Sequence, residues 1–142
     1  MLKFVLYNSH QIQKKMKKII PFLAALFMFS TAQAQTKTTE WPELKAFHAL
    51  MSETFHAAEV GNLAPLKEKK AELYRASKVW YAAEVPANFD KEKTTATLKK
   101  LMIKCNDIWY SIEKKEADEK ITKMITEAHD LFHTVVGECK KH

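Results

Sequence analysis

The chain has 142 residues with 23 Lys and Arg against 17 Asp and Glu, which gives a formal net charge of +6. Five of the lysines and none of the acidic residues fall in residues 1–34, so residues 35–142 carry a net charge of +1. This near-neutral balance gives no support to a nucleic-acid-binding or membrane-surface protein. The 108 residues that follow residue 34 suit one small domain.

Residues 1–34 have the organisation of a secretory signal peptide. A lysine-rich segment precedes the apolar run IIPFLAALFMF, and Ala32 and Ala34 then form the A-x-A pattern of a cleavage site. The apolar run has 11 residues, whereas a membrane-spanning helix needs about 20. The pattern therefore predicts export and cleavage rather than a membrane anchor.

We accordingly expect residues 1–34 to be removed and residues 35–142 to act in the periplasm or outside the cell. Met16 stands immediately before the apolar run and its flanking lysines, and so makes a more ordinary start than Met1. Residues 1–15 are then an extension produced by assigning the start too early.

Amphipathic helices are predicted through the rest of the chain. No stretch alternates apolar and polar residues long enough to indicate a strand, whereas helical spacing is sustained. The first helix is expected over residues 41–59, ending at Gly61 because glycine readily takes a positive φ. The second is expected from about Pro65 to Ala82, before the connection that contains Pro86.

The third helix is expected to begin at Asp90 or Thr94, both of which are capping residue types. The fourth follows the polar turn KKEAD and is expected to continue to about Lys140. Each of these two helices has an apolar face, formed by Leu98, Leu101, Met102, Cys105, Ile108, Trp109 and Ile112 in the third and by Ile121, Ile125, Ala128, Phe132, Val135 and Cys139 in the fourth. Four such stripes joined by short turns predict an all-α, up-down-up-down antiparallel four-helix bundle after a cleavable signal peptide.

The two cysteines are expected at different heights in such a bundle. Cys105 precedes the third turn by about 10 residues and Cys139 follows it by more than about 20, which separates them by roughly 15–20 Å along the axis. A disulfide needs Cα atoms within about 7 Å. We therefore predict no intrachain disulfide, with Cys105 as a small buried core residue.

Four of the six histidines fall at the flanks of apolar stripes. His48 and His56 belong to the first expected helix, and His129 and His133 belong to the fourth. The first and fourth helices are antiparallel neighbours in a closed bundle, so His48 is expected level with His133, and His56 within about a turn of His129. Four imidazoles can therefore line one groove.

This arrangement indicates a transition-metal site. The i, i+4 spacing of His129 and His133 places both rings on one side of a helix, about 6 Å apart in rise, where they can chelate one ion. Nitrogen ligands favour Cu or Zn over Mg or Ca. The leading hypothesis is an exported protein that binds Cu or Zn through His48, His56, His129 and His133 for capture, buffering or delivery. A bundle that uses its histidines structurally, without a cofactor, is an alternative.

No pattern indicates an enzyme. A nucleophile with a base, a phosphate-binding loop and a paired-carboxylate cleft are all missing from the sequence. Glu53-x-x-His56 has no second ExxH unit to complete a carboxylate di-iron site. The pair Cys139-x-x-His142 is a weaker ligand candidate, because it lies at a chain end that is expected to fray.

The helix lengths, the VPANF connection, LKAFHALM in the first helix and DLFH near the end of the fourth resemble the periplasmic cytochrome b562 family and, more distantly, the cytochrome c′ family. In the b562 family a Met on the first helix and a His on the last hold a non-covalent haem. By position, His48 matches that Met and His133 matches that His. The resemblance implies bis-His haem ligation and electron transfer as an alternative function.

The chain also departs from that family. CKKH at the C-terminus is not the CxxCH motif that attaches haem covalently. Phe47, Phe55 and Phe132 are expected to fill space that a porphyrin needs. These departures favour a bare metal ion over a haem.

Overall fold

The structure is a computed structural model that describes residues 40–141. Its elements are α2 (Pro42–Glu59), α3 (Ala64–Ala82), α4 (Lys91–Glu113), α5 (Asp118–His133) and the π-helix η2 (Thr134–Glu138). The expected signal peptide, residues 1–34, lies outside the described residues. Within residues 40–141 there is no strand, and a single isolated bridge joins Phe89 and Lys140.

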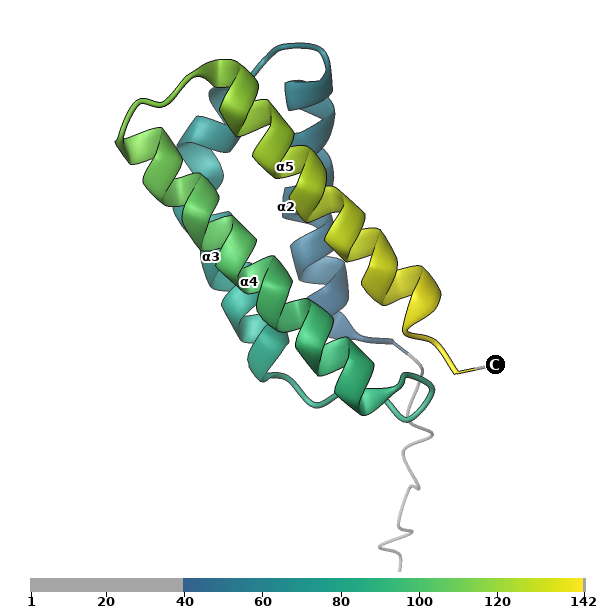
Figure 1. Cartoon of the computed structure of the whole chain (residues 1–142). Coiled ribbons are helices and arrows are strands. Elements are labelled where there is room, and N and C mark those ends of the chain that lie inside the picture. Colours follow the sequence, from purple (N-terminus) through teal and green to yellow (C-terminus); the bar gives the residue numbers. More distant parts are fainter. Residues whose placement is uncertain (1–39, 142) are drawn as a thin grey trace, which may run out of the picture. The chain divides into compact units, whose positions relative to one another are not determined.

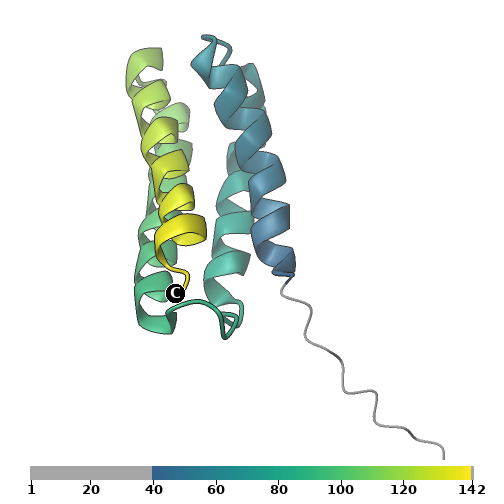
Figure 2. The same ribbon diagram turned by 90° about the vertical axis from the view of Figure 1, so that its right-hand side faces the viewer.

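The four α-helices form a bundle. α2 packs against α3 and α5, and α4 packs against the same two helices, so the contacts close into a ring (Figures 1 and 2). The predicted all-helical bundle class is confirmed for this part of the chain. None of the helices described is long and apolar enough to cross a membrane.

Three aromatic side chains pack against one another in the core between α2, α3 and α5. Phe47 lies 5.3 Å from Trp80 and 6.2 Å from Phe132, measured between ring centroids, and Trp80 lies 6.0 Å from Phe132. All three side chains are buried. Burying such a side chain stabilises the fold by roughly 1.5–3 kcal/mol, so this group is a main source of stability at the end of the bundle where α2 begins.

The predicted helix ends are confirmed at two places. Gly61 has φ +81°, and the amides of Gly61 and Asn62 donate to the carbonyls of Ala58 and Ala57, which is the Schellman arrangement. At the start of α4, Asp90 is the cap, because its carboxylate accepts a hydrogen bond of 2.8 Å from the amide of Lys93. The second helix begins at Ala64, one residue before the predicted start.

The fourth helix ends close to its predicted end, but its last residues are not α-helical. The α-helix ends at His133 and continues as a π-helix, in which the amide of Cys139 donates to the carbonyl of Thr134, five residues before it. Gly137 and the two valines before it are weak helix formers, so the last turn is easily widened. Val135 and Cys139 remain buried, as the periodicity predicted.

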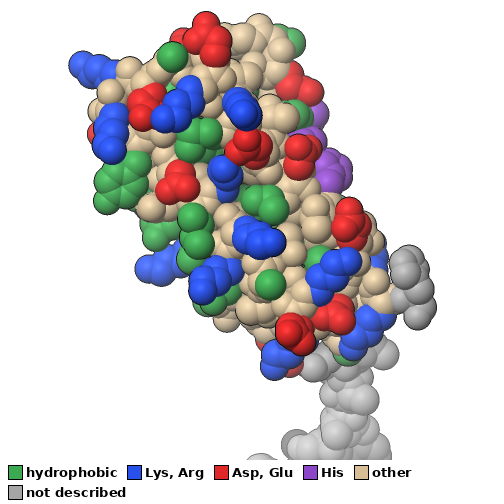
Figure 3. All heavy atoms as spheres, in the orientation of Figure 1, with side chains coloured by type: hydrophobic (Ala, Val, Ile, Leu, Met, Phe, Trp, Pro, Cys, Tyr) green, Lys and Arg blue, Asp and Glu red, His purple; other side chains and the backbone are tan. Residues whose placement is uncertain are grey.

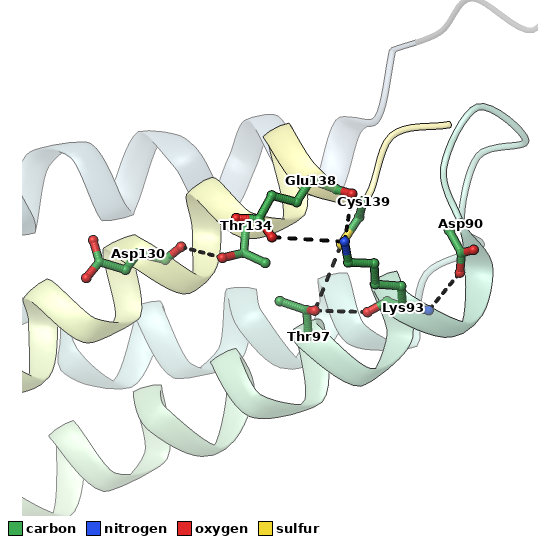
Figure 4. A network of polar contacts seen from close by, with 7 residues as sticks. All are labelled: Asp90, Lys93, Thr97, Asp130, Thr134, Glu138 and Cys139. Atoms are coloured by element: carbon green, nitrogen blue, oxygen red, sulfur yellow. Dashed lines mark hydrogen bonds and ion pairs between the residues drawn. The ribbon is translucent and has the colours of Figure 1, made fainter. Parts of the chain in front are cut away.

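Contacts with the start of α4 hold the widened turn in place. Lys93 Nζ donates to the carbonyl of Glu138 at 3.0 Å, and the amide of Asp90 donates to the carbonyl of Cys139 at 2.8 Å. Figure 4 shows Lys93 lying between Asp90 and the end of the chain. The turn that follows His133 is therefore fixed by tertiary contacts rather than by local helical propensity.

Candidate metal site

The four predicted histidines lie along the edge where α2 and α5 meet. Figure 3 shows the histidine side chains gathered on one side of the molecule. His48, His56 and His133 are exposed, whereas His129 is half-buried. This edge is open to solvent, so an ion could reach the imidazole nitrogens directly.

His129 and His133 form the closest pair. Their Nε2 atoms are 3.2 Å apart, and the rings are nearly perpendicular, with an angle of 83° between their planes. Two imidazole nitrogens that each lie 2.0–2.1 Å from one ion are separated by roughly 2.9–3.4 Å, from square-planar to tetrahedral geometry. The observed separation fits chelation of one ion as well as it fits a hydrogen bond between the rings.

A stack against α2 fixes the orientation of His129. The imidazole lies 3.7 Å from the ring of Phe55, centroid to centroid, with only 12° between the planes. Phe55 is itself buried in the core. His129 is thereby held in one orientation before any ligand arrives, which lowers the entropic cost of binding.

The surroundings of His129 favour its neutral form. Burial lowers the pKa of the imidazole, and the neighbouring His133 lowers it further. The carboxylates of Asp130 and Glu59 raise this pKa, but they do not reverse the shift. Neutral imidazole is the form that binds metal ions, so His129 is ready to act as a ligand near neutral pH.

His56 lies next to this pair without being part of it. Its ring centroid is 6.4 Å from that of His129, and its Nδ1 is 2.8 Å from Oε2 of Glu59. The contact occupies Nδ1 of His56, so Nε2 is the nitrogen left to bind an ion. In the part of the chain that is described, no three His, Cys, Asp or Glu side chains are close enough to hold a metal ion.

Phe132 separates His48 from the other histidines. The His48 imidazole lies parallel to the Phe132 ring, with 5.0 Å between centroids and 2° between planes. The ring of His133 contacts the same phenylalanine at 5.4 Å. His48 is therefore at the expected level along α5, but its ring is committed to a stack on Phe132.

The residues present do not fit a haem between His48 and His133. Such a haem needs a slot inside the bundle, with both imidazoles turned towards it. Both histidines are exposed, and the interior beside them holds the buried rings of Phe47 and Phe132. These phenylalanines pack on Trp80 and on each other, so the space is already filled.

Neither thiol contributes to this site. Burial raises the pKa of the Cys105 thiol to about 12, which keeps it protonated. Cys139 is fully buried, with its sulfur 3.9 Å from the hydroxyl oxygen of Thr97. Both are free cysteines. His142, the predicted partner of Cys139, lies outside the described residues.

The sequence pattern predicts Phe55 only as an interior side chain, and its contact with His129 is an addition from the structure. The predicted antiparallel register that aligns His56 with His129 also brings Phe55 to that level. The stack itself, however, depends on side-chain rotamers, which register does not determine.

Comparison with known proteins does not identify a family or a function for the chain. No protein-family model, curated protein or solved structure matches the chain. The resemblance to the cytochrome b562 family therefore rests on the sequence pattern alone, and the case for function rests on the geometry of the histidine edge.

Proposed function

We propose that the chain is an exported, up-down-up-down four-helix bundle that binds one divalent transition-metal ion at its α2–α5 edge. The observation that carries the proposal is the 3.2 Å separation of the Nε2 atoms of His129 and His133. These two imidazoles are the chelating pair. His56 is the adjacent candidate for a third ligand, and it reaches the ion by rotating away from its present position.

The ligand set favours Cu(II) or Zn(II). Both ions accept neutral imidazole nitrogen, and either can complete its coordination with water at an open site. A site of two or three histidines on an exposed edge exchanges its ion readily. This supports capture, buffering or delivery of the ion rather than a permanent structural role.

Calorimetric titration of the chain with Zn²⁺ tests the proposal. The experiment uses residues 35–142, the chain expected after export, with His142, which lies outside the described residues, replaced by alanine. We expect one ion per chain. His129→Ala and His133→Ala should each weaken the affinity by about tenfold or more, because even an outer-shell partner of a metal ligand is worth that much.

His48→Ala is the matched control. It removes another exposed histidine that contacts Phe132, and it should leave the Zn²⁺ affinity unchanged. Equal losses of Zn²⁺ affinity in the His48→Ala and His133→Ala variants would contradict the proposed ligand set. No binding by the background chain would support the cofactor-free bundle instead.

A further inference from the structure

A groove between α3 and α4 is lined largely by aromatic side chains. It has a volume of about 430 Å³ and is lined by Tyr74, Asn106, Trp109, Tyr110 and Glu113. This volume falls within the range of about 300–1,000 Å³ that is usual for small-ligand sites. Figure 3 shows hydrophobic side chains on the α4 side of the molecule, away from the histidines. The groove is therefore separate from the proposed metal site.

The aromatic rings that line the groove either contact one another or are exposed to solvent. Tyr74 on α3 and Trp109 on α4 have centroids 5.8 Å apart with 50° between their planes, so they form two adjoining walls. Tyr110, one residue further along α4, is 60% exposed although it is a large hydrophobic side chain. A ring that is exposed to this extent contributes little to the core, and its face remains open to a ligand.

An acidic side chain lies among the aromatic rings that line the groove. Of the residues that line it, only Glu113 is charged. Oε1 of Glu113 already pairs with an ammonium group, since Nζ of Lys70 lies 3.3 Å away. Aromatic faces attract cations within about 6 Å of the ring centroid, and quaternary ammonium groups are bound in aromatic sites of this kind.

We propose that this groove binds a small organic cation of the quaternary-ammonium class. The ammonium group lies against the faces of Tyr74, Trp109 and Tyr110, and Glu113 supplies the opposing charge. Lys70 competes for the same carboxylate. The proposal uses none of the histidines, so it stands or falls independently of metal binding.

Titration with choline, followed by the indole N–H signals in NMR spectra, tests this site. The chain has three tryptophans, and the signals of the buried Trp41 and Trp80 serve as internal controls. We expect the Trp109 signal to shift with saturation. The neutral carbon analogue of choline, in which a tert-butyl group replaces trimethylammonium, should bind about tenfold more weakly, from the usual strength of a cation–π contact.

Matched variants separate the ring face from the charge. Tyr110→Phe keeps the aromatic face and should preserve choline binding, whereas Tyr110→Leu removes that face and should weaken it. Glu113→Gln should also weaken choline binding. Lys70→Gln removes the competing ammonium and should strengthen it, while the affinity for the neutral analogue stays unchanged.

Three outcomes would overturn the proposal. The first is a Trp109 signal that does not shift with choline. The second is equal affinity for choline and its neutral analogue, which would make the groove merely apolar. The third is a Lys70→Gln variant that binds choline no more tightly than the unchanged chain, which would mean that Glu113 does not attract the ligand.

Discussion

At the scale of single residues, the behaviour of His129 is set by its burial and by the rings around it. Stacking on Phe55 fixes its orientation, and burial lowers its pKa. The same ring lies 3.2 Å from the partner nitrogen of His133. Orientation, protonation state and ligand spacing thus all favour metal binding at this one position.

Metal binding should depend on pH, because protons compete with the ion for the same nitrogens. We expect the Zn²⁺ affinity to fall as the pH is lowered, because only the neutral imidazole binds the ion. Calorimetric titrations at several pH values measure this. An affinity that does not change between pH 7.5 and 5 would show that the ion is held by groups other than histidine.

The metal-free protein should also lose stability in acid. The pKa of His129 is lower in the folded chain than its ordinary value of about 6.5, so the unfolded chain binds more protons in the window below pH 6.5. His129 therefore makes stability fall as the pH drops through that window. Urea unfolding at several pH values should show a shallower fall for His129→Gln. An unchanged slope would contradict the burial of this ring.

At the scale of elements, two helices end with residues of positive φ but different side chains. Gly61 ends α2 with φ +81°, and Lys115 follows α4 with φ +54°. The amides of Lys115 and Glu116 donate to the carbonyls of Ile112 and Ser111, so this end repeats the Schellman arrangement. Lysine has a Cβ, so the left-handed conformation costs it energy that glycine avoids.

Opposite substitutions at these ends should have opposite effects on stability. Gly61→Ala should destabilise the fold by about 1 kcal/mol, purely through backbone conformation, because an added Cβ would meet no atom within 4 Å. Lys115→Gly should stabilise it by about 0.5–1 kcal/mol. Urea unfolding of both variants measures these changes. Stabilisation by Gly61→Ala would contradict the positive φ at that position.

Helix periodicity predicted most of the fold, because each buried stripe depends on spacing within its own segment. The ends at Gly61 and Asp90 were also predictable from local rules. The π-helix after His133 was not, because Lys93 and the residue 88–90 segment hold it from another part of the chain.

For the candidate site, the levels of the histidines along the helices were predictable, but the orientations of their rings were not. Antiparallel register placed His56 close to His129 and brought His48 to the level of Phe132, the residue before His133. Register does not determine side-chain rotamers, however. The stack of His48 on Phe132, which sets it apart from the other histidines, therefore had no signal in the sequence.

At the scale of the whole molecule, the end of the chain is tied to the α3–α4 connection. The amide of Asp90 donates to the carbonyl of Cys139, and the amide of Lys141 donates to the carbonyl of Asn88. Cys139 is fully buried beneath these bonds. Residues 139–141 therefore cover the end of the bundle that also holds the cluster of Phe47, Trp80 and Phe132.

A chain that ends at Glu138 should accordingly be less stable by about 2.5–6.5 kcal/mol. It loses one buried side chain and three backbone hydrogen bonds, with typical values of about 1–2 and 0.5–1.5 kcal/mol each. Chemical unfolding measures the difference, with a chain that ends at Lys141 as the control. Equal stability of the two chains would show that these contacts contribute nothing.

The central claim is that His129 and His133 together bind one metal ion. Proton–nitrogen correlation spectra of the histidine rings during a Zn²⁺ titration test it most directly, because they report each ring nitrogen separately. We predict that the Nε2 signals of His129 and His133 change together and saturate at one equivalent, while those of His48 do not. Changes confined to other histidines, or no change in any ring, would contradict the claim.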